Sequence, residues 1–247
     1  MGNIHEDRDL RDRLYVFRDR WDAGERLGRY LADFPGLDEP LACPIPAGGV
    51  PVGIAVSRAL GCPLRPLVVR KVQIPWNPEA GFGAVTWDGR VFLNEDLLGR
   101  LRLTPEQVET AVQKARVNVR ERVSLFTAGV SYPDPAGRTC IIVDDGLASG
   151  YTMTAAAGAL RSLHPRGIIV AVPTGSLDSV RRVAGLVDDL VCLNIRSGYS
   201  FAVADAYGDW YDLSEDDALR LLRKTLEPGD GGRQEPPAER PSGPGGR

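Results

Sequence analysis

Short apolar runs alternate with stretches of helical periodicity along most of the chain. The apolar runs are rich in β-branched residues and are bounded by Gly, Pro or charge, a pattern typical of strands buried on both faces of a parallel sheet. Strands that alternate with helices predict an α/β fold with a doubly wound, mostly parallel sheet. The predicted strands are Leu41–Ile45, Leu67–Val69, Cys140–Val143, Ile168–Val172 and Leu190–Leu193, and the predicted helices cover roughly 21–34, 51–60, 104–125, 152–163 and 176–185.

Helix-start signals mark two of the helical stretches. Thr104 followed by Gln107 forms a capping box at the start of the longest helix, with Pro105 in its first turn. Ser214, followed by three acidic residues, predicts the N-cap of a last helix that ends near Leu226.

The segment between the second predicted strand and the longest helix indicates an insertion. Gly83–Thr86 and Val91–Leu93 flank an Asp88-Gly89 pair, which is a hairpin signal. The stretch before it, Val72–Phe82, reads as a long irregular loop. We therefore expect a β-hairpin and helical insertion beside the parallel sheet.

The last twenty residues differ from the rest of the chain. Pro228–Arg247 holds 6 Gly and 5 Pro and no aliphatic side chain larger than that of Ala238. Such a segment buries too little apolar surface to offset the entropy lost on ordering. We predict one domain over residues 1–227 and a disordered tail over 228–247.

Composition excludes several classes of protein. The 33 acidic and 30 basic residues give a net charge of −3, so the chain lacks the basic footprint of a duplex-binding protein. No apolar run approaches the roughly 18–20 residues of a membrane span, and the charged N-terminus is unlike a signal peptide. With two His and four widely spaced Cys, a metal cage is not expected. We predict a cytoplasmic protein with reduced cysteines and without nucleic-acid or membrane partners.

The most specific chemical signal follows the apolar strand Cys140–Val143. Asp144 and Asp145 come first, then a loop of small residues, and then a helix that begins near Thr152. Backbone N–H groups of such a loop, with the positive end of the helix dipole, suit a phosphate. The carboxylates would repel a phosphate and need sugar hydroxyls, a metal ion or a developing cation as partner. The alternative is a solvated acidic turn.

Two further segments fit an anion site. The turn Pro46–Gly53 follows a predicted strand, and its paired glycines, Gly48 and Gly49, permit close approach of the backbone to an anion. Arg70 and Lys71 end another predicted strand and offer positive charge. Taken singly, the first is also explained as a simple strand-to-helix turn and the second as a solvated strand end.

These segments together resemble the type I phosphoribosyltransferases, enzymes that use phosphoribosyl diphosphate (PRPP). The acidic pair and small-residue loop are similar to the family's PRPP-binding motif, and the Gly-Gly turn is similar to its pyrophosphate loop. The chain also resembles uncharacterised bacterial proteins of this family in Phe17–Arg20, Gly83–Val85 and Leu93–Asp96. The resemblance implies the family's α/β fold with a small hood, here about Arg196–Leu213.

The resemblance also implies a role for each site residue. Asp144 and Asp145 would hold the ribose hydroxyls, with Lys71 as a third catalytic residue. Ala47 stands where relatives commonly carry a basic residue, and Tyr151 replaces a small residue, so its side chain should point outward or cover the sugar. The 5-phosphate would contact Ala148, Ser149, Gly150, Tyr151 and Thr152, and the pyrophosphate would contact Ala47, Gly48, Gly49, Arg70 and Lys71.

The implied reaction moves the 5-phosphoribosyl group to a nitrogen nucleophile of unknown identity, with Mg²⁺ held mainly by the substrate near Asp144 and Asp145. Two other functions stay open: a phosphoribosyl hydrolase and a non-catalytic sensor of PRPP or a nucleotide. A homodimer is also open. The hood aromatics, which would either stack on a planar acceptor or form core, are Tyr199, Phe201, Tyr207, Trp210 and Tyr211.

Overall fold

The computed structural model describes residues 2–127, 132–198 and 200–226. The predicted tail and Tyr199 lie outside these ranges. The strands are β1 Asn3–His5, β2 Leu41–Pro44, β3 Val69–Ile74, β4 Asn77–Thr86, β5 Val91–Leu93, β6 Thr139–Val143, β7 Gly167–Ser176 and β8 Asp189–Arg196. The helices are α1 Arg20–Ala32, α2 Gly49–Leu60, α3 Glu95–Leu101, α4 Pro105–Thr127, α5 Tyr151–Arg161, α6 Leu177–Ala184 and α7 Glu215–Leu226, with a 3-10 turn at Val203–Ala206.

The main sheet has five parallel strands in the order β1-β8-β7-β6-β2. This confirms the predicted α/β fold. The central pairing places Pro44 at the end of β2 beside Val143 at the end of β6. The segments that follow these two strands, the Gly-Gly turn and the acidic pair, therefore leave the sheet side by side.

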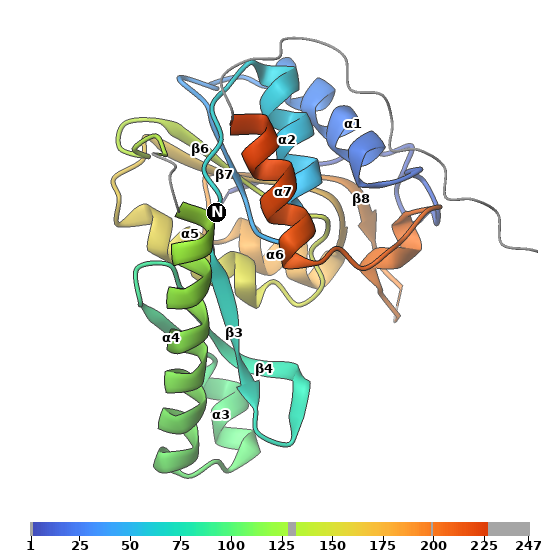
Figure 1. The fold of residues 1–247 in the computed structure, drawn as a ribbon. Helices are drawn as coiled ribbons and strands as arrows, with labels where there is room; N and C mark the ends of the chain where they lie inside the picture. Colours follow the sequence, from blue (N-terminus) through green and yellow to red (C-terminus); the bar gives the residue numbers. More distant parts are fainter. Residues whose placement is uncertain (1, 128–131, 199, 227–247) are drawn as a thin grey trace, which may run out of the picture.

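Helices cover both faces of this sheet, and the strand residues divide between them by alternation. Ile141 and Val143 of β6 pack in a cluster with residues of α1 and α2. Cys140 and Ile142, one position out of phase, pack with residues of α5 and α6. Figure 1 shows α1 and α2 together at one side of the molecule, with α7 beside α2.

A second, antiparallel sheet of β3-β4-β5 carries α3 and α4 and projects from the body as an arm, which we define as residues 69–127 (Figure 1). Two sequence predictions are wrong here. The strand predicted at Leu67–Val69 does not join the parallel sheet; β3 begins at Val69 and belongs to the arm. The stretch Val72–Phe82 is mostly the β3–β4 pair rather than an irregular loop.

The reason for the second error lies in the side-chain pattern of β3. Val72 and Ile74 are buried toward α4, while Lys71 is exposed and Gln73 is partly exposed. This is a two-residue period, which indicates a strand with one covered face, but a register shift around Gln73 interrupts it. The predicted hairpin that follows is confirmed as β4–β5.

Several local predictions are confirmed. Thr104 and Gln107 exchange capping hydrogen bonds at the start of α4, 2.9 and 3.3 Å long. Ser214 Oγ accepts from the Asp217 N–H at 3.1 Å and caps α7. The four cysteines are unpaired and buried. Two elements were not predicted: β1, at the edge of the sheet, and α3 in the arm. Within the described ranges, no helix is long and apolar enough to cross a membrane.

Candidate active site

The acidic pair lies at the carboxyl end of β6, where open α/β sheets bind their ligands. The Asp145 N–H donates to Asp144 Oδ1 at 2.9 Å, so the two residues form one compact turn. The Gly-Gly turn packs directly against them. A Cβ on Gly49 would lie 2.7 Å from the Val143 carbonyl oxygen, and a Cβ on Gly48 would collide with the Asp145 carboxylate. Only glycine allows this approach.

The Gly-Gly turn begins with a cis peptide bond between Pro46 and Ala47. The Ala47 side chain packs against the cluster that includes Val50 and offers no charge to the site. A pyrophosphate bound at this turn would therefore contact backbone N–H groups rather than a charged side chain.

The two carboxyl groups differ in electrostatic environment. Burial, and then the neighbouring charge of Asp145, raise the pKa of Asp144 well above its ordinary value. Burial also raises the pKa of Asp145, but the Arg20 guanidinium opposes this shift. Arg20 Nε donates to Asp145 Oδ2 at 2.9 Å. Asp145 is therefore the member of the pair that more readily carries the charge, and Asp144 is the one that more readily holds a proton.

Arg20 is the site residue that sequence reasoning missed as such. Asp19 caps α1 by accepting from the Asp22 N–H at 2.9 Å, which makes Arg20 the first helical residue. Its partner, Asp145, lies 125 residues further along the chain. The one available signal was the Phe17–Arg20 segment shared with the family, which named the residue without giving it a role.

The loop after the acidic pair is held from behind by α6. The carbonyl oxygen of Ala148 accepts from Ser176 Oγ and Ser179 Oγ, and that of Ser149 accepts from Arg182 Nη1 at 2.7 Å. The C=O and N–H of a trans peptide point in opposite directions, so the N–H groups of Ser149 and the next residue face away from α6.

The loop ends at Gly150, directly before the N-terminus of α5. Gly150 has a φ of +76°, which glycine adopts without strain, and α5 starts directly after it. Ala148 and Ser149 are exposed. Outward N–H groups at a helix N-terminus form an anion site. Thr152 lies in the first turn of α5, close to this site in sequence.

The Tyr151 side chain turns toward the arm. Its hydroxyl receives a hydrogen bond from Asn94 Nδ2, and Asn94 also caps α3 by accepting from the Leu97 N–H at 3.1 Å. Arg182 lies 5.3 Å from the centre of the Tyr151 ring. Tyr151 also lines a small cavity of about 280 Å³ with Thr154, whose hydroxyl is buried without a hydrogen-bond partner. The first turn of α5 therefore ties the phosphate loop to the arm.

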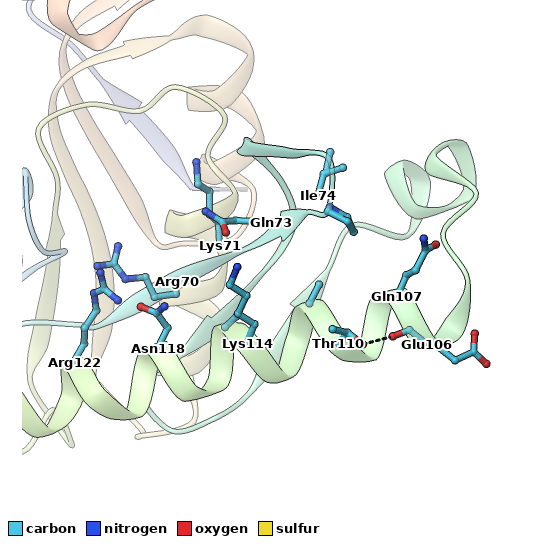
Figure 2. Close-up of a pocket in the computed structure, with 13 residues that line it drawn as sticks. Arg70, Lys71, Gln73, Ile74, Glu106, Gln107, Thr110, Lys114, Asn118 and Arg122 are labelled. Carbon is cyan, nitrogen blue, oxygen red and sulfur yellow. Dashed lines mark hydrogen bonds between the residues drawn. The ribbon is translucent and has the colours of Figure 1, made fainter.

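Arg70 and Lys71 lie on β3 in a larger pocket of about 730 Å³ between β3 and α4 (Figure 2). Arg70 is already engaged there. Arg70 Nη2 and Arg122 of α4 both bind the carboxylate of Glu215 on α7. Figure 2 shows Arg70 and Arg122 reaching toward each other. The structure thus joins the acidic pair to the Gly-Gly turn, and sets Arg70 and Lys71 in the cleft beside α4.

The hood segment combines core and surface. Tyr207 is 1% exposed, and its hydroxyl donates to the Asp145 carbonyl oxygen at 2.6 Å. Trp210 and Tyr211 remain 37% and 47% exposed. Phe201 lies under the guanidinium of Arg196. Tyr207 is therefore a core residue, as one interpretation predicted, whereas Trp210 and Tyr211 are partly exposed and their stacking on an acceptor stays a prediction.

The main sheet has five parallel strands with helices on both faces, and an acidic pair followed by a small-residue loop stands at the end of one strand. This arrangement is the fold class of the type I phosphoribosyltransferases. The chain belongs to the phosphoribosyl transferase domain family, whose model matches residues 38–205.

Relatives of the chain agree with this assignment. The chain is 35% identical, over 209 residues, to a provisionally assigned phosphoribosyl transferase, Rv0571c, of Mycobacterium tuberculosis (strain ATCC 25618 / H37Rv). The aligned residues cover 85% of this chain and 47% of the relative. A counterpart in strain CDC 1551 / Oshkosh, MT0597, gives the same figures. The chain thus spans about half the length of the curated relatives it matches. The crystal structure of TT1426 from Thermus thermophilus superposes with a TM-score of 0.71 at 32% identity, covering 85% of this chain and 99% of that one.

Proposed function

We propose that the chain transfers the 5-phosphoribosyl group of PRPP to a nitrogen nucleophile and releases pyrophosphate. One observation carries the proposal: the acidic pair at the end of β6 packs directly against the Gly48–Gly49 turn and continues into a loop whose N–H groups face outward. Phosphate, ribose and pyrophosphate then have adjoining sites in the order in which PRPP carries them.

Each part of the site has a defined task in this reaction. The loop from Ala148 to Thr152 would hold the 5-phosphate through backbone N–H groups and the hydroxyls of Ser149 and Thr152. Asp144 and Asp145 would accept hydrogen bonds from the ribose hydroxyls. The Ala47–Gly49 turn would donate backbone N–H groups to the pyrophosphate, and Arg70 and Lys71 would add positive charge from β3.

Catalysis follows from charge that develops in the transition state. The bond from ribose C1 to pyrophosphate breaks ahead of full bond formation to nitrogen, so the ring becomes oxocarbenium-like and the leaving group gains negative charge. The carboxylate of Asp145, the more acidic of the pair, would offset the positive ring. Donors of the Gly-Gly turn and Lys71 would stabilise the pyrophosphate.

The proposal includes Mg²⁺ as cofactor. Within the described ranges, no group of three or more His, Cys, Asp or Glu side chains forms a metal cage. The residues present fit an ion that reaches the site on PRPP, held by phosphate oxygens and water, as Mg²⁺ prefers. The ion would supply neutralisation of the pyrophosphate charge.

Exposed aromatic surface supports a planar acceptor, such as a nucleobase or a similar ring. Trp210 and Tyr211 of the hood segment are partly exposed and lie next to the Arg20–Asp145 pair. Aromatic rings of this kind stack on planar ligands. A nucleobase acceptor would give the protein a role in nucleotide metabolism, which we propose to be cytoplasmic.

A phosphoribosyl hydrolase is the second candidate. The packed, uncharged Ala47 side chain favours a hydrolase that acts on a nucleotide, because the leaving group is then a base and no pyrophosphate has to be bound. A sensor of PRPP or a nucleotide is the non-catalytic counterpart.

Pyrophosphate release from PRPP and Mg²⁺ separates these functions when measured with and without a panel of purine, pyrimidine and other nitrogen-ring acceptors. Transfer predicts base-dependent release, and hydrolysis predicts base-independent release. Binding of PRPP without turnover indicates a sensor. Asp145→Asn should abolish turnover, and Asp38→Asn at an exposed ion pair should leave it unchanged. A fully active Asp145→Asn enzyme would contradict the assigned site.

A further inference from the structure

Arg20 is 4% exposed and spans three separate parts of the chain. From the first turn of α1, its Nε donates to Asp145 Oδ2 at 2.9 Å and its Nη1 donates to the Tyr211 carbonyl oxygen at 2.8 Å. A buried guanidinium is costly unless its donors are paired, so these two acceptors fix the side chain.

The face of the guanidinium is also covered. Its central carbon lies 3.9 Å from the centre of the Trp210 ring and 5.5 Å from that of Tyr211. Stacking on an aromatic face stabilises a cation, and more so when water is excluded. Arg20 is therefore held on its edge by Asp145 and on its face by the hood segment.

Asp145 is held from other sides as well. Its carbonyl oxygen accepts from the Tyr207 hydroxyl at 2.6 Å, and Gly48 leaves no room on the side of Oδ2. Tyr207 in turn packs against Trp210, with ring centres 5.3 Å apart. The main chain and one carboxylate oxygen of Asp145 are thus both fixed by residues around Arg20.

We propose that Arg20 is a positioning residue for the reaction: it orients the Asp145 carboxylate toward the ribose of PRPP and couples that orientation to residues 207–211 of the hood segment. This rests on the proposed function. Arg20 acts through Asp145 and does not itself contact substrate. If Arg20 were only a structural tie between α1 and the hood, its loss would lower the thermal stability without changing the affinity of folded protein for PRPP.

Calorimetric titration of PRPP with Mg²⁺ into the whole protein tests this, together with KM and kcat from pyrophosphate release. Arg20→Gln should raise the Kd and KM for PRPP about tenfold or more, the effect of losing a charge-assisted hydrogen bond on a ligand-binding carboxylate. Guanidinium ion, added far below denaturing concentration, should restore part of the affinity. Arg20→Lys should lie between the wild type and Arg20→Gln.

Arg26→Gln is the matched control. Arg26 lies on the same helix and forms a partly buried ion pair with Asp22 at 3.1 Å. It should leave the Kd unchanged. If wild-type protein does not bind PRPP, the proposed function fails. If wild type binds and folded Arg20→Gln binds equally well, or gains nothing from guanidinium, the positioning role is overturned.

Should Arg20→Gln not fold, Trp210→Leu replaces it. That change removes the indole ring that stacks on the Arg20 guanidinium and leaves the Arg20–Asp145 pair intact. A several-fold weaker Kd for PRPP is expected with unchanged secondary structure by circular dichroism. An unchanged Kd would contradict the coupling of the hood to Asp145.

Discussion

Asp144 and Asp145 are neighbours in the sequence and in space, but burial affects them unequally. Asp145 has the Arg20 guanidinium at 2.9 Å, whereas burial and the adjacent carboxylate together raise the pKa of Asp144. The folded protein therefore holds an acidic group that favours its protonated form. Such a group reduces stability at the pH where it must ionise, a common cost of a preorganised site.

Asp144→Asn should stabilise the protein while removing activity. The folded-state pKa of Asp144 lies above the unfolded value of about 3.9, so the folded state binds more protons and wild-type stability falls as pH rises above that value. The Asp144→Asn variant does not lose stability in this way, because its amide does not ionise. Thermal unfolding should show no difference between the two proteins below about pH 4, and a gain in stability of the variant that grows as the pH rises toward neutral.

Asp38→Asn is the control for this pH dependence, because Asp38 is exposed in its pair with Arg166. Its unfolding curve should follow that of the wild type to within about 0.5 kcal/mol at every pH. Asp145→Asn should instead lower stability, since it weakens the partner of a buried guanidinium. A destabilised Asp144→Asn protein at neutral pH would contradict the inequality of the pair.

Gly48→Ala should disable the site by displacing Asp145. The added Cβ would collide with the carboxylate that Arg20 holds, so the collision could be relieved only at the expense of the Arg20–Asp145 hydrogen bond. We expect loss of PRPP binding by calorimetry and a destabilisation of about 1–3 kcal/mol by denaturant unfolding. Gly99→Ala gives the contrast: Gly99 is inside α3 with no atom near its Cβ position, so stability should rise by about 0.5–1 kcal/mol.

At the scale of elements, one carboxylate joins the arm to the body. Glu215 on α7 binds both Arg70 of β3 and Arg122 of α4, and all three side chains are less than a third exposed. Arg70 Nε is buried and has no hydrogen-bond partner among the described residues, whereas its Nη2 pairs with Glu215. The last helix thus fixes the strand that carries Lys71.

Glu215→Gln should loosen this connection. Two guanidinium groups would lose their shared charge partner, at a cost of about 1–3 kcal/mol in the free energy of unfolding. Hydrogen exchange should increase in β3 and α4 and change little in β7. Glu121→Gln, at an exposed position beside Arg122 on α4, is the control. Equal exchange in both variants would contradict the role given to Glu215.

Elements whose stability is encoded locally were predictable. The apolar strands β6 and β7 and the capped helices α4 and α7 carry their signals within a few residues. The edge strand β1 was not, because Asn3–His5 becomes a strand only through pairing with β8, nearly the whole chain away. The arm's first strand was also missed, because its alternation is short and its pairing with β4, with a register shift around Gln73, is set by the fold.

The residues of the candidate site also differ in whether their signals are local in the sequence. The acidic pair and its loop are contiguous, so their order carried the prediction of a phosphate site. Arg20 could not be assigned from the sequence, since its role depends on a contact across 125 residues. The state of Arg70 depends on Glu215, which also comes from a distant element.

At the scale of the whole molecule, the segments of the proposed PRPP site come from three parts of the chain. The Gly-Gly turn follows β2, the phosphate loop follows β6, and Lys71 belongs to the arm. PRPP bound to all three would stabilise the folded state as a unit, because a ligand that binds only folded protein adds RT ln(1 + [L]/Kd) to stability.

Thermal unfolding in the presence of PRPP and Mg²⁺ should therefore shift upward as one transition. At a ligand concentration of about 100 times Kd the expected gain is about 2.7 kcal/mol, or roughly 5–11 °C for a domain of this size. Chelation of Mg²⁺ should reduce the shift, because the pyrophosphate charge is then left without its counterion. Gly48→Ala should show no shift. A shift that chelation leaves unchanged would place the binding energy in the 5-phosphate loop alone and remove the pyrophosphate turn from the site.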